Sequence, residues 1–188
     1  MRDLVHKHVE KIEGVVVSKL EKAVDSRGSL IKSRPLPLLS NNLDSVLFSV
    51  NPKAGVIRGL HFQLPPYGQE KLVTCLQGSV YDVAVDLRFD SDTYGCWMIT
   101  NLSPESNIQI FLPIGVAHGF QTLLPNSIIS YLVTNEYSPT DAISINPLGE
   151  LGISWPVKEY EISEQDLKGI GFLSAAELYQ NSLNKTRK

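Results

Sequence analysis

The residues with the clearest capacity for chemistry lie in the segment RGLHFQ (58–63), where a cation, a glycine and an imidazole interrupt an apolar run. A histidine at this place can bind a metal, transfer a proton or fill the core. A transition-metal site needs three or four converging ligands. The residue that would share a strand face with His61 is Gln63, and His118 is the only other histidine in this region of the chain. Because this ligand set is poor, we expect no metal.

Proton transfer requires a base that titrates near neutral pH, a carboxylate that orients it, an acid on the other face of the substrate, and a cation for a developing oxyanion. The sequence offers His61 as the base, Tyr131 as the acid and Lys71 as the cation. The candidates for the carboxylate are Asp82, Asp86 and Asp166. A purely structural role for His61 also stays open, because a lone histidine in a strand is more often a core residue whose hydrogen bonds are made by the protein.

The same alternative applies to the other candidates. A tyrosine such as Tyr131 on an apolar strand usually packs in the core with its hydroxyl at the rim, and a lysine such as Lys71 is usually a solvated edge charge. Arg27, in VDSRGSL, is typical of a turn. His118, in LPIGVAHGF, is expected in a loop rich in proline and glycine, where it either stabilises a turn or contacts a ligand.

The elements that must position these residues are strands. Between about residue 14 and residue 156, short runs rich in Val, Ile, Tyr and Phe alternate with turn signals, which predicts an all-β sandwich or barrel. In SVYDVAVDLR (79–88) an apolar face alternates with a face carrying two aspartates, which is expected to meet a polar interior or solvent. The apolar face consists of Tyr81, Val83, Val85 and Leu87, and the other carries Asp82 and Asp86.

The pattern changes after Trp155 and Pro156. The segments ISEQDLKG and LSAAELYQNSL predict short C-terminal helices, with Ser163 and Ser174 as N-caps. A chain of 188 residues with 43% apolar content suits one core, so we expect a single domain over 1–188.

Composition excludes several classes of protein. A net charge of -3 gives no global basic field, so we expect no nucleic-acid partner. Cys75 and Cys96 lack disulfide or metal spacing, which predicts reduced thiols and a cytoplasmic location. No segment approaches the roughly 20 apolar residues that a membrane span needs, so no membrane association is expected.

Taken in order, GVIRGLHFQ, QEKLVTCLQGSVYDVAVDLR, SDTYGCW, LPIGVAHGF, YLVTNEYSP, ISWP and ISEQD resemble the dTDP-4-dehydrorhamnose 3,5-epimerase family from about residue 13 to residue 166. The resemblance implies a cupin-like jelly-roll barrel of antiparallel strands that works as a homodimer without metal or organic cofactor. It also implies a nucleotide-diphosphate 4-keto-6-deoxyhexose as substrate, epimerised at the carbons that flank the ketone.

The resemblance assigns roles by position. The family's catalytic residues match His61 (base), Asp166 (its carboxylate partner), Tyr131 (acid) and Lys71 (enolate stabiliser). Its substrate-binding residues match Arg58 at the diphosphate, Tyr137 near the nucleotide base, Gln63, His118, and Arg27, which an exchanged N-terminal segment offers to the partner subunit's site.

Strict strand alternation conflicts with these assignments, because it puts Arg58 and His61 on opposite faces. A bulge at Gly59 would turn both side chains inward.

The chain also departs from the family in places that concern substrate recognition. Leu30 and Lys32 replace an aromatic residue and a glutamate, and INPLGEL, with Asn146, replaces a Trp-x-Asp segment. Two other functions stay open: a cupin-type sugar 3,4-ketoisomerase, which VDSRGSL also resembles, and a non-catalytic nucleotide-sugar binding module.

Overall fold

The computed structural model describes residues 6–33 and 43–186, and strands dominate it. The strands are β1 (Val16–Lys19), β2 (Glu21–Asp25), β3 (Gly28–Lys32), β4 (Leu43–Asn51), β5 (Val56–Gln63), β6 (Lys71–Gln77), β7 (Val80–Asp86), β8 (Trp97–Leu102), β9 (Ile108–Leu112), β10 (Val116–Thr122), β11 (Ser127–Thr134), β12 (Ala142–Ser144) and β13 (Glu161–Ile162). The helices are α1 (Glu164–Leu167) and α2 (Phe172–Thr186).

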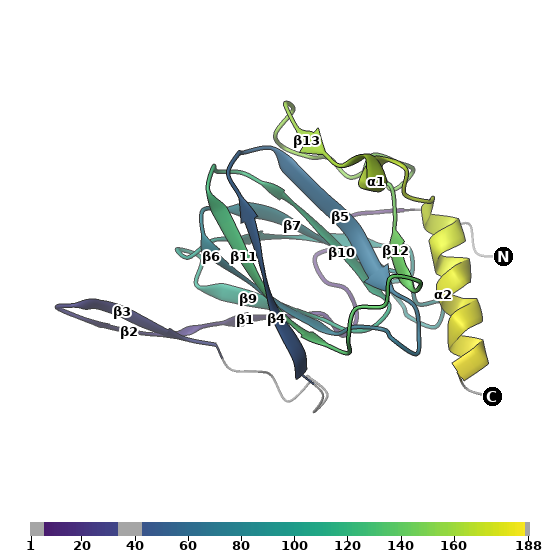
Figure 1. The fold of residues 1–188 in the computed structure, drawn as a ribbon, viewed down its shortest axis with the longest axis horizontal. Coiled ribbons are helices and arrows are strands. Elements are labelled where there is room, and N and C mark those ends of the chain that lie inside the picture. The colour runs from purple at the N-terminus through teal and green to yellow at the C-terminus, as the bar shows by residue number, and fades with distance from the viewer. Residues whose placement is uncertain (1–5, 34–42, 187–188) are drawn as a thin grey trace.

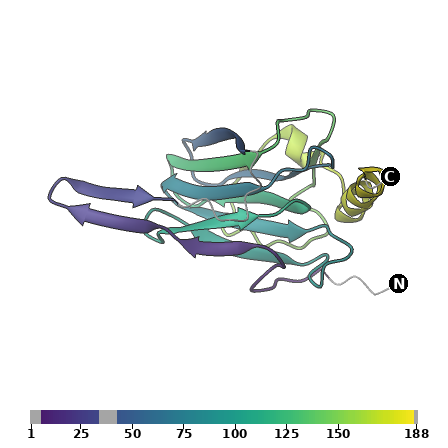
Figure 2. The same ribbon diagram turned by 90° about the horizontal axis from the view of Figure 1, so that it is seen from below.

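The strands form two facing sheets and a separate hairpin (Figures 1 and 2). One sheet has the order β1-β9-β6-β11-β4, and the other has the order β12-β5-β10-β7-β8 with β13 added beside β5. All pairings are antiparallel except that of β13 with β5. The hairpin β2–β3 projects from one end of the body, and α2 lies at the opposite end. This jelly-roll arrangement confirms the all-β prediction.

The six-stranded sheet is buried on both faces, and the alternation in β7 shows why. Val83 and Val85 pack with Phe172 of α2, whereas Ala84 packs between the sheets with residues such as Ile110. The polar face predicted for this strand therefore points into the interior. Asp82 and Asp86 are 1% and 0% exposed. A buried carboxylate requires a partner, and His118, which is bonded to Oδ2 of Asp82, belongs to the candidate site.

A bulge in β5 resolves the conflict between Arg58 and His61. Opposite β5, Phe120 pairs with Arg58 and His118 pairs with His61, so three steps along β5 match two steps along β10. The extra residue is accommodated at Gly59, whose φ is +101°. Both Arg58 and His61 then line the cavity between the sheets, against strict alternation and in the way that a bulge at Gly59 allows.

The expected places of His118 and Arg27 need correction. His118 lies within β10 and not in a loop, because β10 pairs with β5 on one side and with β7 on the other. Arg27 occupies a turn as predicted, but this turn joins β2 to β3, which the sequence did not indicate as strands.

Of the two predicted N-caps, one is confirmed. The Ser163 hydroxyl accepts a hydrogen bond from the backbone N–H of Asp166 at 3.1 Å, a contact worth about 1 kcal/mol in typical helices. Ser174 is not a cap, because α2 begins before it: the carbonyl of Gly171 accepts from the amide of Ala175. The buried ring of Phe172 anchors this first turn to the core.

Cys75 and Cys96 are both buried free thiols, in accord with the sequence. Within residues 6–33 and 43–186, neither helix has the length and apolar character to cross a membrane.

Candidate active site

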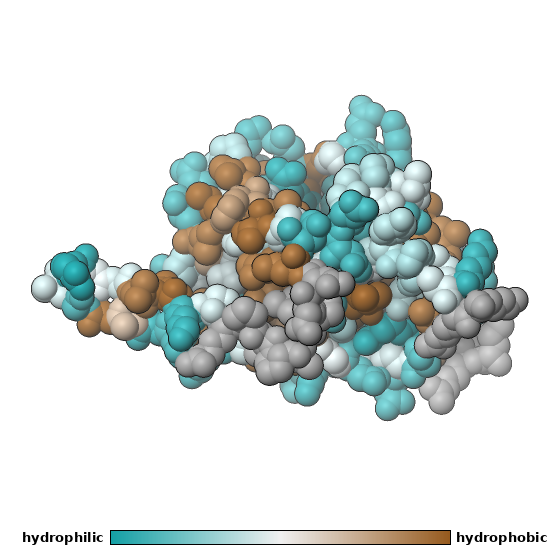
Figure 3. Space-filling view, turned by 60° about the horizontal axis from the view of Figure 1, so that its bottom comes forward, coloured by the Kyte–Doolittle hydropathy of each residue, from teal (hydrophilic) through white to brown (hydrophobic). Residues whose placement is uncertain are grey.

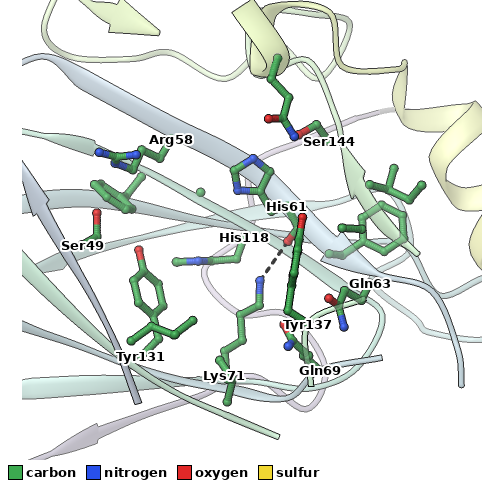
Figure 4. Close-up of a pocket in the computed structure, with 18 of the residues that line it drawn as sticks. Ser49, Arg58, His61, Gln63, Gln69, Lys71, His118, Tyr131, Tyr137 and Ser144 are labelled. Carbon is green, nitrogen blue, oxygen red and sulfur yellow. Dashed lines mark hydrogen bonds between the residues drawn. The ribbon is translucent and has the colours of Figure 1, made fainter. Parts of the chain in front are cut away.

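A cavity of about 490 Å³ opens between the two sheets, and most of the residues expected to do chemistry line it (Figure 4). The six-stranded sheet contributes Arg58, His61, Gln63, His118 and Ser144, and the five-stranded sheet contributes Ser49, Lys71 and Tyr131. His61 therefore faces Lys71 and Tyr131 from the opposite wall. A ligand in this cavity would have an imidazole on one side and an ammonium and a phenol on the other.

Asp166 is the carboxylate that orients His61. The Nε2 of His61 lies 2.6 Å from Oδ1 of Asp166, and the His61 side chain is 46% exposed whereas that of Asp166 is 7% exposed. Partial burial acts to raise the pKa of Asp166, but the hydrogen bond and charge of His61, with the N–H of Gly59, outweigh it and hold the pKa below its ordinary value. The ionised carboxylate accepts the proton of Nε2, which leaves the lone pair on Nδ1.

A second histidine–carboxylate pair lies deeper in the cavity wall. The Nε2 of His118 is 2.7 Å from Oδ2 of Asp82, and both side chains are almost fully buried. The imidazole also contacts the ring of Tyr131 edge-on, with centroids 5.9 Å apart. The third candidate carboxylate, Asp86, is bonded instead to Arg88, Ser91 and Thr93, away from both histidines.

Lys71 extends from the start of β6 into the cavity, where its Nζ donates to the carbonyl oxygen of His61 at 3.3 Å. Burial disfavours the ammonium and lowers the pKa of Lys71 to about 8, although the negative charge of Asp82 acts in the opposite direction. The lysine is therefore a cation held in a partly dry site near neutral pH. Such a charge interacts strongly with an oxyanion.

Tyr131 lies on β11, between β6 and β4, with its ring directed into the cavity (Figure 4). Burial raises the pKa of its phenol well above the ordinary value, and the charge of Asp82 adds to this effect. The phenol therefore stays protonated at neutral pH. It can give a proton to a stronger base and regain it afterwards.

Arg58 and Tyr137 stand at the exposed side of the cavity. The Nε of Arg58 donates to Oδ1 of Asn51 at 2.8 Å, which fixes the guanidinium beside the opening. Tyr137 is 66% exposed and lines the same cavity. An exposed cation and an exposed ring that line the same cavity suit a ligand that carries an anionic group and a planar group.

Gln63 lines the cavity, but its amide is occupied by the protein. Its Nε2 donates to the carbonyl oxygens of Tyr67 and Glu136, and its Oε1 accepts from the N–H of Ser138. These bonds hold the two ends of the segment that carries Tyr137. The structure thus gives Gln63 a supporting place in the site.

Arg27 does not lie in the cavity of its own chain. It sits at the tip of the projecting hairpin, where its side chain is 88% exposed and pairs with Asp25 at 2.6 Å. Leu30 and Lys32, the two departures from the family, lie on β3 of the same hairpin. Asn146 is also outside the cavity, because its Nδ2 donates to the carbonyl of Leu167 at the end of α1.

Two residues of the site were not found by sequence reasoning. Ser144 donates to Asp166 from β12, a three-residue strand with weak signals, and Asn51 orients Arg58 from the last position of β4. Nothing in the local pattern marks either residue. Among the residues that the structure describes there is no group of three or more His, Cys, Asp and Glu placed to hold a metal.

The fold and the site define a class: a cupin-like jelly roll whose two sheets enclose a histidine–aspartate pair, a lysine and a tyrosine. A family model described as dTDP-4-dehydrorhamnose 3,5-epimerase matches residues 9–173. The chain belongs to this dTDP-4-dehydrorhamnose 3,5-epimerase family.

Individual relatives support the assignment. The chain is similar to a dTDP-4-dehydrorhamnose 3,5-epimerase of Sinorhizobium fredii, with 45% identity over 122 residues, or 63% of this chain and 62% of that protein. The alignment thus spans less than two thirds of that relative. A dTDP-4-dehydrorhamnose 3-epimerase of Streptomyces niveus is 38% identical over 82% of this chain and 78% of its own length.

A solved structure extends the likeness to three dimensions. The dTDP-6-deoxy-D-glucose-3,5-epimerase of Legionella pneumophila, in complex with dTDP-4-keto-L-rhamnose, superposes with a TM-score of 0.81 and 34% identity. The match covers 88% of this chain and 92% of that one.

Proposed function

We propose that this protein epimerises a nucleotide-diphosphate 4-keto-6-deoxyhexose at C3, C5 or both. The observation that carries the proposal is that His61, Lys71 and Tyr131 line one cavity from two opposing sheets. The family membership and the bound sugar nucleotide named for the Legionella relative support a substrate of this class.

The chemistry follows from the acidity of a carbon next to a ketone. In the proposed first step, Nδ1 of His61 takes the proton, and the electron pair moves into the ketone to give an enolate. The Nζ of Lys71, with His118 beside it, stabilises the oxyanion in a partly dry site. Asp166 stabilises the imidazolium that forms.

Inversion requires that the new proton arrive on the opposite face of the ring. Tyr131 comes from the five-stranded sheet and His61 from the six-stranded sheet, so a hexose ring between them presents one face to each. The phenol delivers its proton to the carbon as the enolate collapses to the ketone. The electrons stay within the sugar, and the reaction as written uses no redox or organic cofactor.

The nucleotide half of the substrate would extend out of the cavity. We propose that Arg58 meets the diphosphate and that Tyr137 contacts the base; the position of both residues in the cavity lining supports these roles. We propose that Arg27 reaches the same substrate from the partner subunit of a homodimer, through exchange of the hairpin β2–β3. The exposure of Val24 and Leu30 on this hairpin, 72% and 75%, supports such an exchange because these side chains would gain by burial.

The test is deuterium exchange. The protein is incubated in heavy water with a 4-keto-6-deoxy nucleotide sugar, and NMR follows deuterium at C3 and C5. We expect solvent deuterium in the product, with a loss of at least about 100-fold in His61→Ala, because a missing general base typically costs 10²–10⁴. Tyr131→Phe should retain exchange on the His61 face but lose inversion.

Other results would identify the other candidates. A product whose carbonyl has moved to C3 would indicate a 3,4-ketoisomerase. Tight binding with no exchange, or undiminished exchange in His61→Ala, would contradict the epimerase and favour a binding module.

A further inference from the structure

We propose that Ser144 is a positioning residue of the His61–Asp166 pair, an inference that rests on the proposed function. Ser144 would fix the carboxylate toward the imidazole and take up part of its negative charge, and so keep Nδ1 of His61 free to accept a proton. Neither the residue's type nor its short strand marks it for this role in the sequence.

The contacts of the carboxylate carry the inference. Oδ1 of Asp166 accepts from Nε2 of His61 at 2.6 Å and from the hydroxyl of Ser144 at 3.1 Å. Oδ2 accepts from the N–H of Gly59 at 3.3 Å. The serine and the histidine therefore share one oxygen, and the other oxygen is held by the β5 bulge.

The backbone holds Ser144 in place for this contact. On β12, Ser144 pairs directly with His61 of β5, and its carbonyl oxygen accepts from the N–H of Ile170 at 3.0 Å. The backbone of Ser144 is therefore paired with β5 on one side and bonded to the segment after α1 on the other. Its side chain lines the cavity between them, as Figure 4 shows.

Two chemical effects follow. First, the hydroxyl adds a second donor to Oδ1 beside that of His61, which further restrains rotation of the carboxylate. Second, the hydroxyl and the imidazolium both draw on the negative charge of Oδ1. The hydroxyl therefore weakens the attraction between the Asp166 carboxylate and the protonated imidazole of His61. Without the hydroxyl, His61 should take up its proton more readily and act as a base over a narrower pH range.

The charged groups around His61 do not replace this effect. Lys71 contacts the backbone oxygen of His61, and His118 pairs with it across the β5–β10 ladder but bonds to Asp82. Arg58 is bonded to Asn51. Ser144 donates its hydroxyl to Oδ1 of Asp166, and the hydroxyl of Ser163, which accepts from the N–H of Asp166, also helps to lower the pKa of that carboxyl.

The experiment compares Ser144→Ala, Ser144→Thr and Ser49→Ala with the wild type. Ser49 lines the same cavity from β4 and bonds to Asn51, so its variant controls for the loss of a cavity hydroxyl that does not touch Asp166. For each protein, the rate of deuterium exchange is measured against pH, together with kcat and KM. In parallel, NMR of ¹⁵N-labelled imidazole follows the titration of His61 directly, without substrate.

For Ser144→Ala we expect the acidic limb of the rate profile to move to higher pH by about half a unit. The value of kcat at the optimum should fall roughly 3- to 10-fold, the effect of one ordinary hydrogen bond, with KM little changed. Ser144→Thr should restore both, because it returns a hydroxyl, and Ser49→Ala should leave the acidic limb in place.

Coincident titrations in Ser144→Ala and the wild type, or no restoration by Ser144→Thr, would overturn the inference. A wild type with no exchange would contradict the proposed function instead. In that case the titration of His61 still decides whether Ser144 controls the pair.

Discussion

At the scale of single residues, Lys71 connects burial to pH dependence. Its pKa is lowered to about 8 because burial disfavours the ammonium, and the proposed enolate needs that ammonium. The charged form is present below this pKa and is lost as the pH rises through it. We expect kcat to fall on the basic side with a midpoint near pH 8, measured as the rate of deuterium exchange from pH 6 to 10.

Replacement of this lysine tests the assignment. In Lys71→Arg the cation persists to far higher pH, so the basic limb near pH 8 should disappear even if the longer guanidinium lowers the maximal rate. Lys53→Met is the control, because Lys53 is exposed and pairs with Glu161 outside the cavity. A basic limb that stays unchanged in Lys71→Arg would assign it to another group.

The sequence identifies the candidate site residues better than it identifies the residues that contact them. His61, Lys71 and Tyr131 all line one cavity. The residue types alone left three aspartates open as the partner of the histidine, and only the family resemblance pointed to Asp166. Asp166 is 105 positions away from His61, and no local pattern reports a contact of that separation. Ser144 escaped notice for the same reason, since its place beside Asp166 depends on how β12 and α1 meet.

At the scale of elements, the bulge in β5 decides whether the site exists. A methyl group on Gly59 would lie 2.6 Å from the carbonyl oxygen of His118 and would require a side chain at a φ of +101°. The methyl group would also lie 2.7 Å from the Cα of Gly119. Because both contacts are with backbone atoms, Gly59→Ala should reduce the free energy of unfolding by roughly 3 kcal/mol. It should also displace His61 from Asp166 and lower exchange strongly, as denaturant titration and NMR would show.

Gly152→Ala is the matched control for backbone conformation. Gly152 also has a positive φ, of +66°, but a methyl group there meets nothing within 4 Å. It should cost about 1 kcal/mol and leave the exchange rate intact. Equal losses of stability in the two variants would mean that close packing at the bulge is unimportant.

The same elements show where sequence patterns are reliable. Alternation predicted the two faces of β7 correctly because both faces pack against something. It failed for β2 and β3, whose side chains are exposed throughout and so carry no pattern of burial. His118 was misplaced because a proline and two glycines suggested a loop, whereas pairing on both sides of β10 makes it a central strand.

At the scale of the whole molecule, the chain exposes apolar surface that a single copy does not cover. On β4, Phe48 and Val50 are each 62% exposed, and the hairpin adds Val24 and Leu30. Figure 3 shows hydrophobic side chains both on the projecting hairpin and on the body next to it. Contiguous patches of this kind often mark an interface between proteins, and exchange of hairpins between two copies would cover them.

Exchange has a functional consequence that can be measured by complementation. If Arg27 serves the partner subunit's cavity, a homodimer of Arg27→Ala should lose roughly 10- to 100-fold in kcat/KM, the usual effect of one charge-assisted contact. His61→Ala should be nearly inactive. A heterodimer of the two variants, however, contains one cavity with an intact His61 that receives an intact Arg27 from the other chain.

Co-expression of the two variants with different tags, followed by tandem purification, isolates that heterodimer. We expect about half of the wild-type activity, because a twofold assembly has two sites and one of them is complete. Arg27 acting within its own chain predicts no recovery, since each site would then lack one of the two residues. A monomeric mass for the wild type by light scattering would contradict the exchange itself, and it would leave the exposed Arg27 and the apolar hairpin without the partner that explains them.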